Sequence, residues 1–374
     1  MDGGRAARWA EMKGQDRAPR QIPPTRGAAH SLLQVLHHLP PPKTTSTLLP
    51  DGTSEVRELF VSSVRPTRVY LPCAVAGNLQ LQVGLFKAIA LPHIAVHSVD
   101  LGDNDIGNLP GSLPALANLL ASQHCIVSDL ALYCNALDDG ALVELSRGVR
   151  NNDTLVDLNL ADNAIGAKGV RALCEALSAG AVPLEVLDLQ GNELVGDEGA
   201  RALATLFDAA RDPPCELRAL HLGRSGVGGD GVAALCATLA EARAAGVSVL
   251  ETLDLDSNDV GERGARALAA LLRDDHADVD APLLEISLLN CGFGLGLAGA
   301  KDLALATKGG AGTVLVLADG GGVERGQYRY LARVGAVPDA LGRTLDAEWT
   351  QTGSEEQGPW TSLAPRLGPG GPRT

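Results

Sequence analysis

Apolar residues in the middle of the chain recur in one eleven-residue pattern, L-x-x-L-x-L-x-x-[N/C]-x-L, in which x is any residue. Close copies begin at Leu155 (LVDLNLADNAI), Leu184 (LEVLDLQGNEL), Leu217 (LRALHLGRSGV), Leu250 (LETLDLDSNDV) and Leu283 (LLEISLLNCGF). Looser copies begin at residues 96 (VHSVDLGDNDI) and 127 (VSDLALYCNAL). The seven starts are separated by 31, 28, 29, 33, 33 and 33 residues, and this even spacing predicts a repeated structural unit.

Each repeat predicts one short strand followed by one helix. The L-x-L alternation suits a strand with one buried face, and the stretch after it has apolar residues at helical spacing, as in Val170, Leu173, Cys174 and Leu177. One such unit cannot bury its apolar face alone, so neighbouring units must stack. We therefore predict an α/β solenoid with a parallel β-sheet on its concave side and α-helices on its convex side.

The repeated pattern resembles the leucine-rich repeat, and its long period with a full helix resembles the ribonuclease-inhibitor-like subclass of that repeat. The resemblance implies a horseshoe-shaped solenoid whose concave face binds a protein partner. Pro66–Ala76 and the stretch from Gly312 onward are possible degenerate first and last copies.

The segments outside the clear repeats are predicted to differ from them. We expect a disordered or loosely packed Pro-rich segment over 1–50, an N-terminal cap over 51–95, about seven repeats over 96–320, a C-terminal cap over 321–350 and a disordered tail over 351–374. Within the C-terminal cap, residues 326–334 (GQYRYLARV) are predicted to form a helix.

The polar ninth position of the pattern is predicted to be structural. A side-chain amide there can pair with backbone groups left open where each strand turns away, so that the amides form a ladder between repeats. The ladder is expected to contain Asn104, Asn135, Asn163, Asn192 and Asn258.

The residues between the strand leucines are predicted to form the concave surface. Acids there are Asp100, Asp103, Asp129, Asp157, Asp162, Glu185, Asp188, Glu251, Asp254, Asp256 and Glu285, against the basic residues Arg218 and Arg224. Tyr133 is the only aromatic residue that this spacing places on the face. One interpretation is a docking face for a basic protein surface; the other is the solvated face of an acidic protein. The candidate partner-binding residues are Asp100, Asp129, Tyr133, Asp157, Asn159, Asp188, Arg218, His221, Asp254 and Asp256.

Composition narrows the function classes. The formal net charge of −14 makes nucleic acid an unfavourable partner, and no apolar run is long enough for a membrane span. The seven cysteines contain no C-x-x-C pair, and no motif of a hydrolase, zinc protease or P-loop occurs. We expect a non-enzymatic protein without metal or cofactor, located in the cytoplasm or alternatively in the nucleus or on the cytoskeleton.

One motif competes with the repeat interpretation. Residues 294–299 (GLGLAG) form G-x-G-x-x-G after a strand-like run, with Asp319 twenty residues later, which is formally a dinucleotide-binding fingerprint. The same strand–turn–helix order is the seventh repeat, and the chain beyond Asp319 lacks the further strands that a dinucleotide-binding domain needs. We therefore favour the repeat.

Two short segments resemble the Ran GTPase-activating proteins. Residues 162–166 (DNAIG) are similar to a turn of that family, and residues 290–294 (NCGFG) followed by Gly299-Ala-Lys301 are similar to a second stretch. The resemblance implies binding of a small GTPase, with Asn163 near the reacting nucleotide. The two segments lie further apart here than in that family, and the acidic C-terminal tail of the family is missing. The repeats also resemble those of nucleotide-binding leucine-rich-repeat immune receptors. A protein-interaction module, a Ran-type GTPase activator and a cytoskeletal or ciliary scaffold therefore remain as alternatives.

Overall fold

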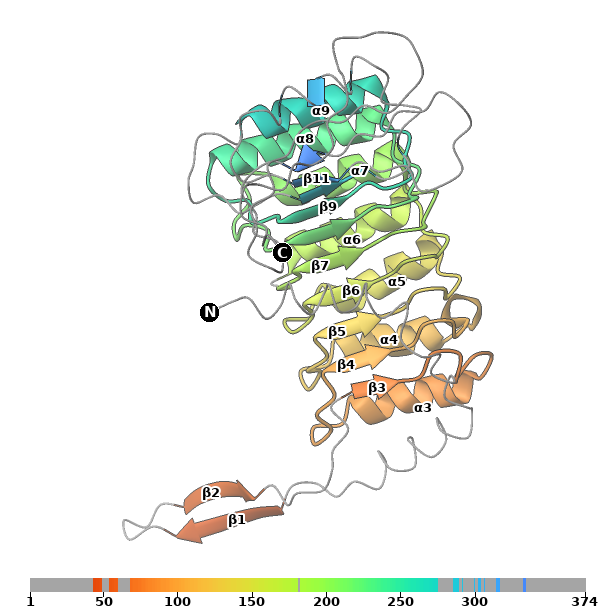
Figure 1. Ribbon diagram of the computed structural model, residues 1–374. Helices are drawn as coiled ribbons and strands as arrows, with labels where there is room; N and C mark the ends of the chain where they lie inside the picture. Colours follow the sequence, from red (N-terminus) through yellow and green to blue (C-terminus); the bar gives the residue numbers. More distant parts are fainter. Residues whose placement is uncertain are drawn as a thin grey trace, which may run out of the picture.

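The computed structural model describes residues 43–48, 54–59, 68–180, 182–274, 285–288, 291, 299, 302–303, 306, 314–316 and 332–333. Its main feature is a sheet with one strand per repeat (Figure 1). The strands are β3 (Arg68–Tyr70), β4 (Ser98–Asp100), β5 (Asp129–Ala131), β6 (Asp157–Asn159), β7 (Val186–Asp188), β8 (Ala219–His221), β9 (Thr252–Asp254), β10 (Glu285–Ser287), β11 (Val314–Val316) and β12 (Ala332–Arg333).

The strands lie in chain order across the sheet. Those from β3 to β10 are all parallel, β11 adds to β10 in parallel, and β12 pairs with β11 in the antiparallel direction. Parallel neighbours require a crossover connection, and a helix supplies it in each repeat from β3 to β9. The predicted α/β solenoid with a parallel sheet is therefore the observed fold.

The helices all lie on one face of the sheet (Figure 1). They are α3 (Leu79–Ile89), α4 (Ser112–Leu120), α5 (Asp139–Val149), α6 (Ala167–Ala179), α7 (Gly196–Ala204), α8 (Gly229–Ala244) and α9 (Gly261–Asp274), with short 3₁₀ turns η2 (Ile106–Asn108) and η3 (Thr205–Phe207). The opposite face of the sheet is the predicted concave face.

The core fills the space between the sheet and the helices. In the repeat that begins at Leu155, Leu158 of β6 and the flanking Leu155 and Leu160 are fully buried in one core with Val170 and Leu173 of α6. Because side chains alternate along a strand, the residues on either side of Leu158 point to the concave face. The aliphatic spacing thus sets which side chains the concave face carries.

The repeat that begins at Leu184 carries one extra residue. Leu194 was assigned to the last apolar position of the pattern, but its side chain is 68% exposed, and Val195 is buried in that position instead. The chain from Asn192 to Gly199 is one residue longer than the equivalent stretch from Asn163 to Gly169. The added residue forces Leu194 out of the core while the rest of the repeat keeps its place.

The terminal segments differ from expectation in two places. β1 (Lys43–Leu48) pairs antiparallel with β2 (Ser54–Leu59), although no strand was predicted before residue 50. The Thr-rich sequence KTTSTL has the β-branched residues that favour strands. Residues 332–333 form a strand within the stretch that was predicted to be a helix, and residues 326–331 and 334 lie outside the described residues. The 1–42 segment and the 351–374 tail, for which we predicted disorder, also lie outside them.

Candidate protein-interaction face

The concave face consists of side chains arranged in rows, because neighbouring strands are in register. One row contains Tyr70, Asp100, Ala131, Asn159, Asp188, His221, Asp254 and Ser287. A second row, two residues earlier in each strand, contains Arg68, Ser98, Asp129, Asp157, Val186, Ala219, Thr252 and Glu285. Tyr133 and Asp256 follow the strands, and Arg218 directly precedes β8. Seven of the ten candidate residues therefore lie in these two rows, and the other three lie next to the strands.

Four residues of the first row also close the turn at the end of their strand. The side-chain Oδ1 of Asp100 accepts a hydrogen bond from the backbone N–H two residues later, at 3.0 Å, and Asn159, Asp188 and Asp254 do the same at 2.9 Å. Such local bonds are typical of Asp and Asn at turns. A short acceptor side chain at this position is therefore explained by the fold alone, whatever the face binds.

Two candidate residues are buried. His221 is 1% exposed and Asp254 is 3% exposed, and their Nδ1 and Oδ2 atoms lie 3.6 Å apart. The sequence pattern predicts the direction of a strand side chain but not what lies over it, so both were expected at the surface. In this structure neither can be a direct contact for a partner.

Two carboxylates in the middle of the face, those of Asp157 and Asp188, have raised pKa values. Burial raises the pKa of Asp157 to about 7, and the neighbouring Asp129 and Asp188 raise it further. Burial also raises the pKa of Asp188, although His221 acts in the opposite direction. Asp129, the neighbour of Asp157 in register, is exposed. A cation placed here would relieve the repulsion among these carboxylates.

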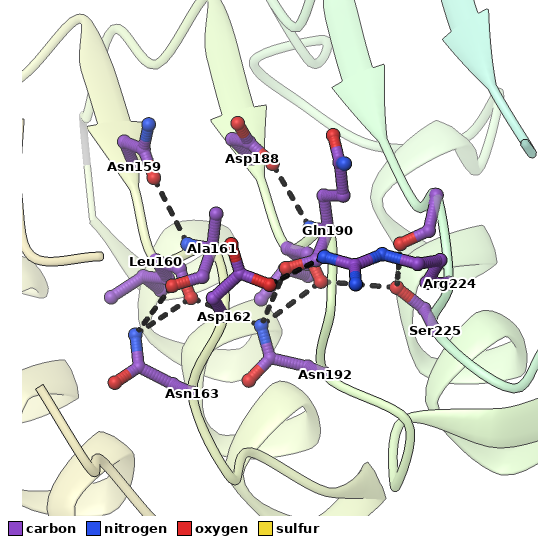
Figure 2. Close-up of polar contacts among 12 residues, drawn as sticks. Asn159, Leu160, Ala161, Asp162, Asn163, Asp188, Gln190, Asn192, Arg224 and Ser225 are labelled. Carbon is purple, nitrogen blue, oxygen red and sulfur yellow. Dashed lines mark hydrogen bonds and ion pairs between the residues drawn. The ribbon is translucent and has the colours of Figure 1, made fainter. Parts of the chain in front are cut away.

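The two arginines of the face are held by acids of the chain itself. Arg218 lies 2.5 Å from Glu251 and 3.8 Å from Glu185, which are acids of the two neighbouring repeats. Arg224 reaches past the repeat next to it and contacts Asp162 at 2.6 Å (Figure 2). Between them lies Gly191, where a side chain would overlap the Asp162 carboxylate. Sequence reasoning missed this pair because its members are 62 residues apart and belong to non-adjacent repeats.

The five asparagines lie at the ends of the strands and bridge adjacent repeats. In Asn163, Oδ1 accepts from the backbone N–H groups of Asn135 and Leu137 at 2.9 and 3.0 Å. Its Nδ2 donates to the carbonyls of Leu132, Leu160 and Ala161, two of which Figure 2 shows. Asn104, Asn135, Asn192 and Asn258 form equivalent bonds. The Asn163 amide is therefore occupied at both ends by backbone groups.

Tyr133 is not the only aromatic residue on the face. Tyr70 of β3 lies opposite Asp100 and is 51% exposed. The prediction was wrong because the offsets were read only from the clear repeats, and β3 lies in the degenerate copy at residues 66–76. Counting the same spacing from residue 66 would have found it.

Other kinds of site have less support in the described part of the chain. Its residues contain no group of three or more His, Cys, Asp or Glu that could hold a metal ion. No helix among them is long and apolar enough to cross a membrane. Of the G-x-G-x-x-G stretch, Gly299 alone is described, in a helix turn, so the dinucleotide hypothesis stays untested.

Comparisons with known proteins point to the same repeat. A family model described as "Leucine Rich repeat" matches residues 151–174, 182–204, 215–236 and 248–269. The curated protein "NACHT, LRR and PYD domains-containing protein 3" from Bos taurus is 33% identical over 94 residues, which cover 25% of this chain and 9% of that protein. Its counterparts from Macaca mulatta and Homo sapiens match with the same identity and coverage. The chain thus matches less than a tenth of the length of these relatives. Four family matches in register with the observed strands and helices show that this chain carries a leucine-rich-repeat solenoid.

Proposed function

We propose that the chain is a non-catalytic protein-interaction module that binds a basic surface of its partner on the concave face. The observation that carries this proposal is the row of carboxylates around Asp157, whose raised pKa records mutual repulsion and burial. A partner's cationic groups would stabilise the charged form of these acids. Binding would therefore relieve the repulsion among them, which favours the complex. The leucine-rich repeats agree with such a role, since repeat solenoids present extended concave surfaces.

The finer assignments are also proposals. A full α-helix in each repeat from β3 to β9 supports the ribonuclease-inhibitor-like subclass. We also propose a cytoplasmic location, and a cytoskeletal or ciliary scaffold as one form that the module could take. The fold agrees with both, but neither rests on a particular residue.

The Ran-type GTPase activator has less support. An asparagine that acts near a nucleotide needs a free amide, but the Asn163 amide bonds to backbone groups on both sides. Mixing the purified chain with GTP-loaded Ran and following hydrolysis tests this alternative directly. Accelerated hydrolysis would restore it and would contradict the non-catalytic proposal.

Site-directed photo-crosslinking tests the proposed face. A photoreactive amino acid at Val186, which lies beside Asp157 on the concave side, is expected to capture a partner from a lysate, whereas the same probe at the exposed Glu175 on the convex helix α6 is not. Capture should weaken with added salt because exposed charges are screened.

A charge-neutral variant completes the test. Replacing Asp157 and Asp188 with Asn keeps an oxygen acceptor for the turn bond of Asp188 but removes two charges. The captured amount should fall at least about fivefold, on the order of 1 kcal/mol. Equal capture by the variant, or equal capture from Glu175 and Val186, would refute the proposed face.

A further inference from the structure

Two tyrosines flank a carboxylate at the β3 end of the concave face. Tyr70 of β3 lies directly opposite Asp100 of β4, and Ala131 of β5 lies on the other side of Asp100. Tyr133, two residues after Ala131, extends back over Gly102, where an added methyl group would overlap its ring. Because Gly102 and Ala131 are small, the Tyr133 ring can reach the vicinity of Asp100. We call Tyr70, Asp100 and Tyr133 the tyrosine patch.

The tyrosine patch combines exposed ring surface with negative charge. Tyr70 is 51% exposed, and Asp103 at the rim is also exposed. Burial raises the pKa of Asp100, while the backbone N–H of Gly102 and the Tyr133 hydroxyl act to lower it. Burial raises the pKa of Tyr133 as well, followed by the charge of Asp100 and the proximity of Tyr70. The three side chains therefore influence one another directly.

Within the described part of the chain, no cation neutralises the patch. Among the described residues, neither Asp100 nor Asp103 takes part in an ion pair; the ion pairs of the concave face lie at Arg218 and Arg224, several repeats away. Arg68, two residues before Tyr70 on β3, lies opposite Ser98 and not opposite Asp100. The carboxylate of Asp103 accepts a hydrogen bond from the Cys73 thiol at 2.9 Å.

The composition makes this arrangement unusual within the chain. Only 4 tyrosines occur in 374 residues, and two of them meet here. A wholly apolar ligand would have to cover Asp100 without pairing its charge, which is costly. A cation satisfies both features, because tyrosine faces attract positive charge and the carboxylate pairs with it.

We propose that the tyrosine patch binds an arginine side chain of the partner, with the planar guanidinium against the tyrosine rings and its N–H groups directed to Asp100. Arginine suits the patch better than lysine because a guanidinium can stack on a ring and form paired hydrogen bonds to a carboxylate. This inference rests on the proposed binding of a basic partner by the concave face, and it adds the residue type recognised and the place where it is held.

The test uses short fluorescein-labelled peptides and the full chain. Three peptides alternate glycine with arginine, with lysine or with citrulline, which has nearly the shape of arginine but no charge. Fluorescence anisotropy at low salt should show binding of the arginine peptide, weaker binding of the lysine peptide and none of the citrulline peptide.

Variants then locate the binding site. Tyr70→Leu should weaken binding of the arginine peptide about two- to fivefold, whereas Tyr70→Phe, which keeps the ring, should not. Asp100→Asn should weaken it at least about fivefold while keeping an acceptor for Gly102. Glu251→Gln removes the same charge at the other end of the face and should change binding less than twofold.

A second perturbation moves one ring without replacing it. Gly102→Ala should weaken binding because its methyl group displaces the Tyr133 ring. Thermal unfolding of each variant separates loss of binding from loss of folding. If changes around Tyr133 prevent folding, the Tyr70 variants still decide the test, because Tyr70 is exposed and its replacement should not disturb the core.

Three outcomes would overturn the tyrosine patch. The first is no binding of the arginine peptide, the second is equal binding of the citrulline peptide, and the third is equal weakening by Asp100→Asn and Glu251→Gln with no effect of Tyr70→Leu. The third result would mean attraction by overall charge. Crosslinking at Val186, which lies outside the tyrosine patch, would still report on the proposed function, so failure of the patch and failure of the concave face can be told apart.

Discussion

Replacing Asn135 with alanine is expected to be among the most destabilising single changes in the solenoid. Its side chain is fully buried between the repeats of β4 and β5. Oδ1 accepts from the N–H groups of Asn104 and Ile106 at 3.1 and 3.2 Å, and Nδ2 donates to the carbonyls of Leu101 and Tyr133 at 2.8 and 3.0 Å. Alanine removes all four bonds and leaves four backbone groups without these partners.

The four bonds set the size of the effect. A buried hydrogen bond contributes about 1 kcal/mol net, and a buried group left without a partner costs about 1–3 kcal/mol. Water entering the vacated space would recover part of this loss. We therefore expect the free energy of unfolding to fall by about 3–5 kcal/mol, which is a large share of the ~5–15 kcal/mol typical of a folded domain.

Urea unfolding followed by circular dichroism measures the change. Asn108→Ala is the matched control, because Asn108 is exposed and its side chain bonds to Asp105 alone among the residues that the structure describes. It should cost no more than about 0.5 kcal/mol. Amide exchange at Asn104 and Ile106 should accelerate in Asn135→Ala, while Val227, which bonds to Asn258, should be less affected. A loss below about 1 kcal/mol would refute the idea that the asparagine ladder holds adjacent repeats together.

Three further changes test other parts of the structure. Burial raises the pKa of Asp157 from 3.8 to about 7, so between these pH values the folded chain keeps a proton that the unfolded chain releases. The free energy of unfolding therefore falls as the pH rises from about 4 to about 7. Asp157→Asn should thus stabilise the protein by roughly 1 kcal/mol or more near pH 8 and have little effect near pH 4, as read from urea unfolding at both pH values; an effect independent of pH would contradict the raised pKa. Gly191→Ala should lower the free energy of unfolding more than Gly246→Ala, which is expected to lower it by about 1 kcal/mol. Both glycines have positive φ, but only at Gly191 would the methyl group overlap Asp162. Equal losses of stability in calorimetry would count against the overlap. Leu194→Ser should leave the melting temperature nearly unchanged while Val195→Ala should cost about 2 kcal/mol, and the reverse order would show that Leu194 fills the core position.

The fold followed from the sequence because each repeat records it independently. Strand leucines such as Leu158, helix residues such as Leu173 and the polar ninth position all recur at one spacing, so an error in one repeat is corrected by its neighbours. The extra residue before Gly199 was also readable, since the count from Asn192 is one longer than in the neighbouring repeats. The apolar pattern places Leu194 in the core, whereas the residue count places Val195 there, as the structure shows.

The concave face was harder to predict because its contacts join residues that no local pattern relates. The pair of Arg224 and Asp162 depends on a glycine in the repeat between them, and the burial of His221 depends on what lies over the strand. Alternation along a strand determines which side a residue faces, whereas exposure and pairing are set by side-chain lengths in two or three repeats together.

The acids of the concave face fall into two kinds, and only one kind is explained by folding. Asp100, Asp188 and Asp254 each accept a backbone hydrogen bond that closes a turn, so a short acceptor there stabilises the solenoid. The carboxylate of Asp157 takes part in no hydrogen bond or ion pair within the described part of the chain, and its pKa of about 7 indicates that the charge opposes folding at neutral pH. The charge of Asp157 lowers the stability of the fold and supports no local turn, so binding of a cationic ligand explains this residue better. Asp157 pairs in register with the exposed Asp129 and lies two strands from Asp100. We therefore expect the centre of binding in the half of the face that also contains the tyrosine patch, and away from the buried pair of His221 and Asp254.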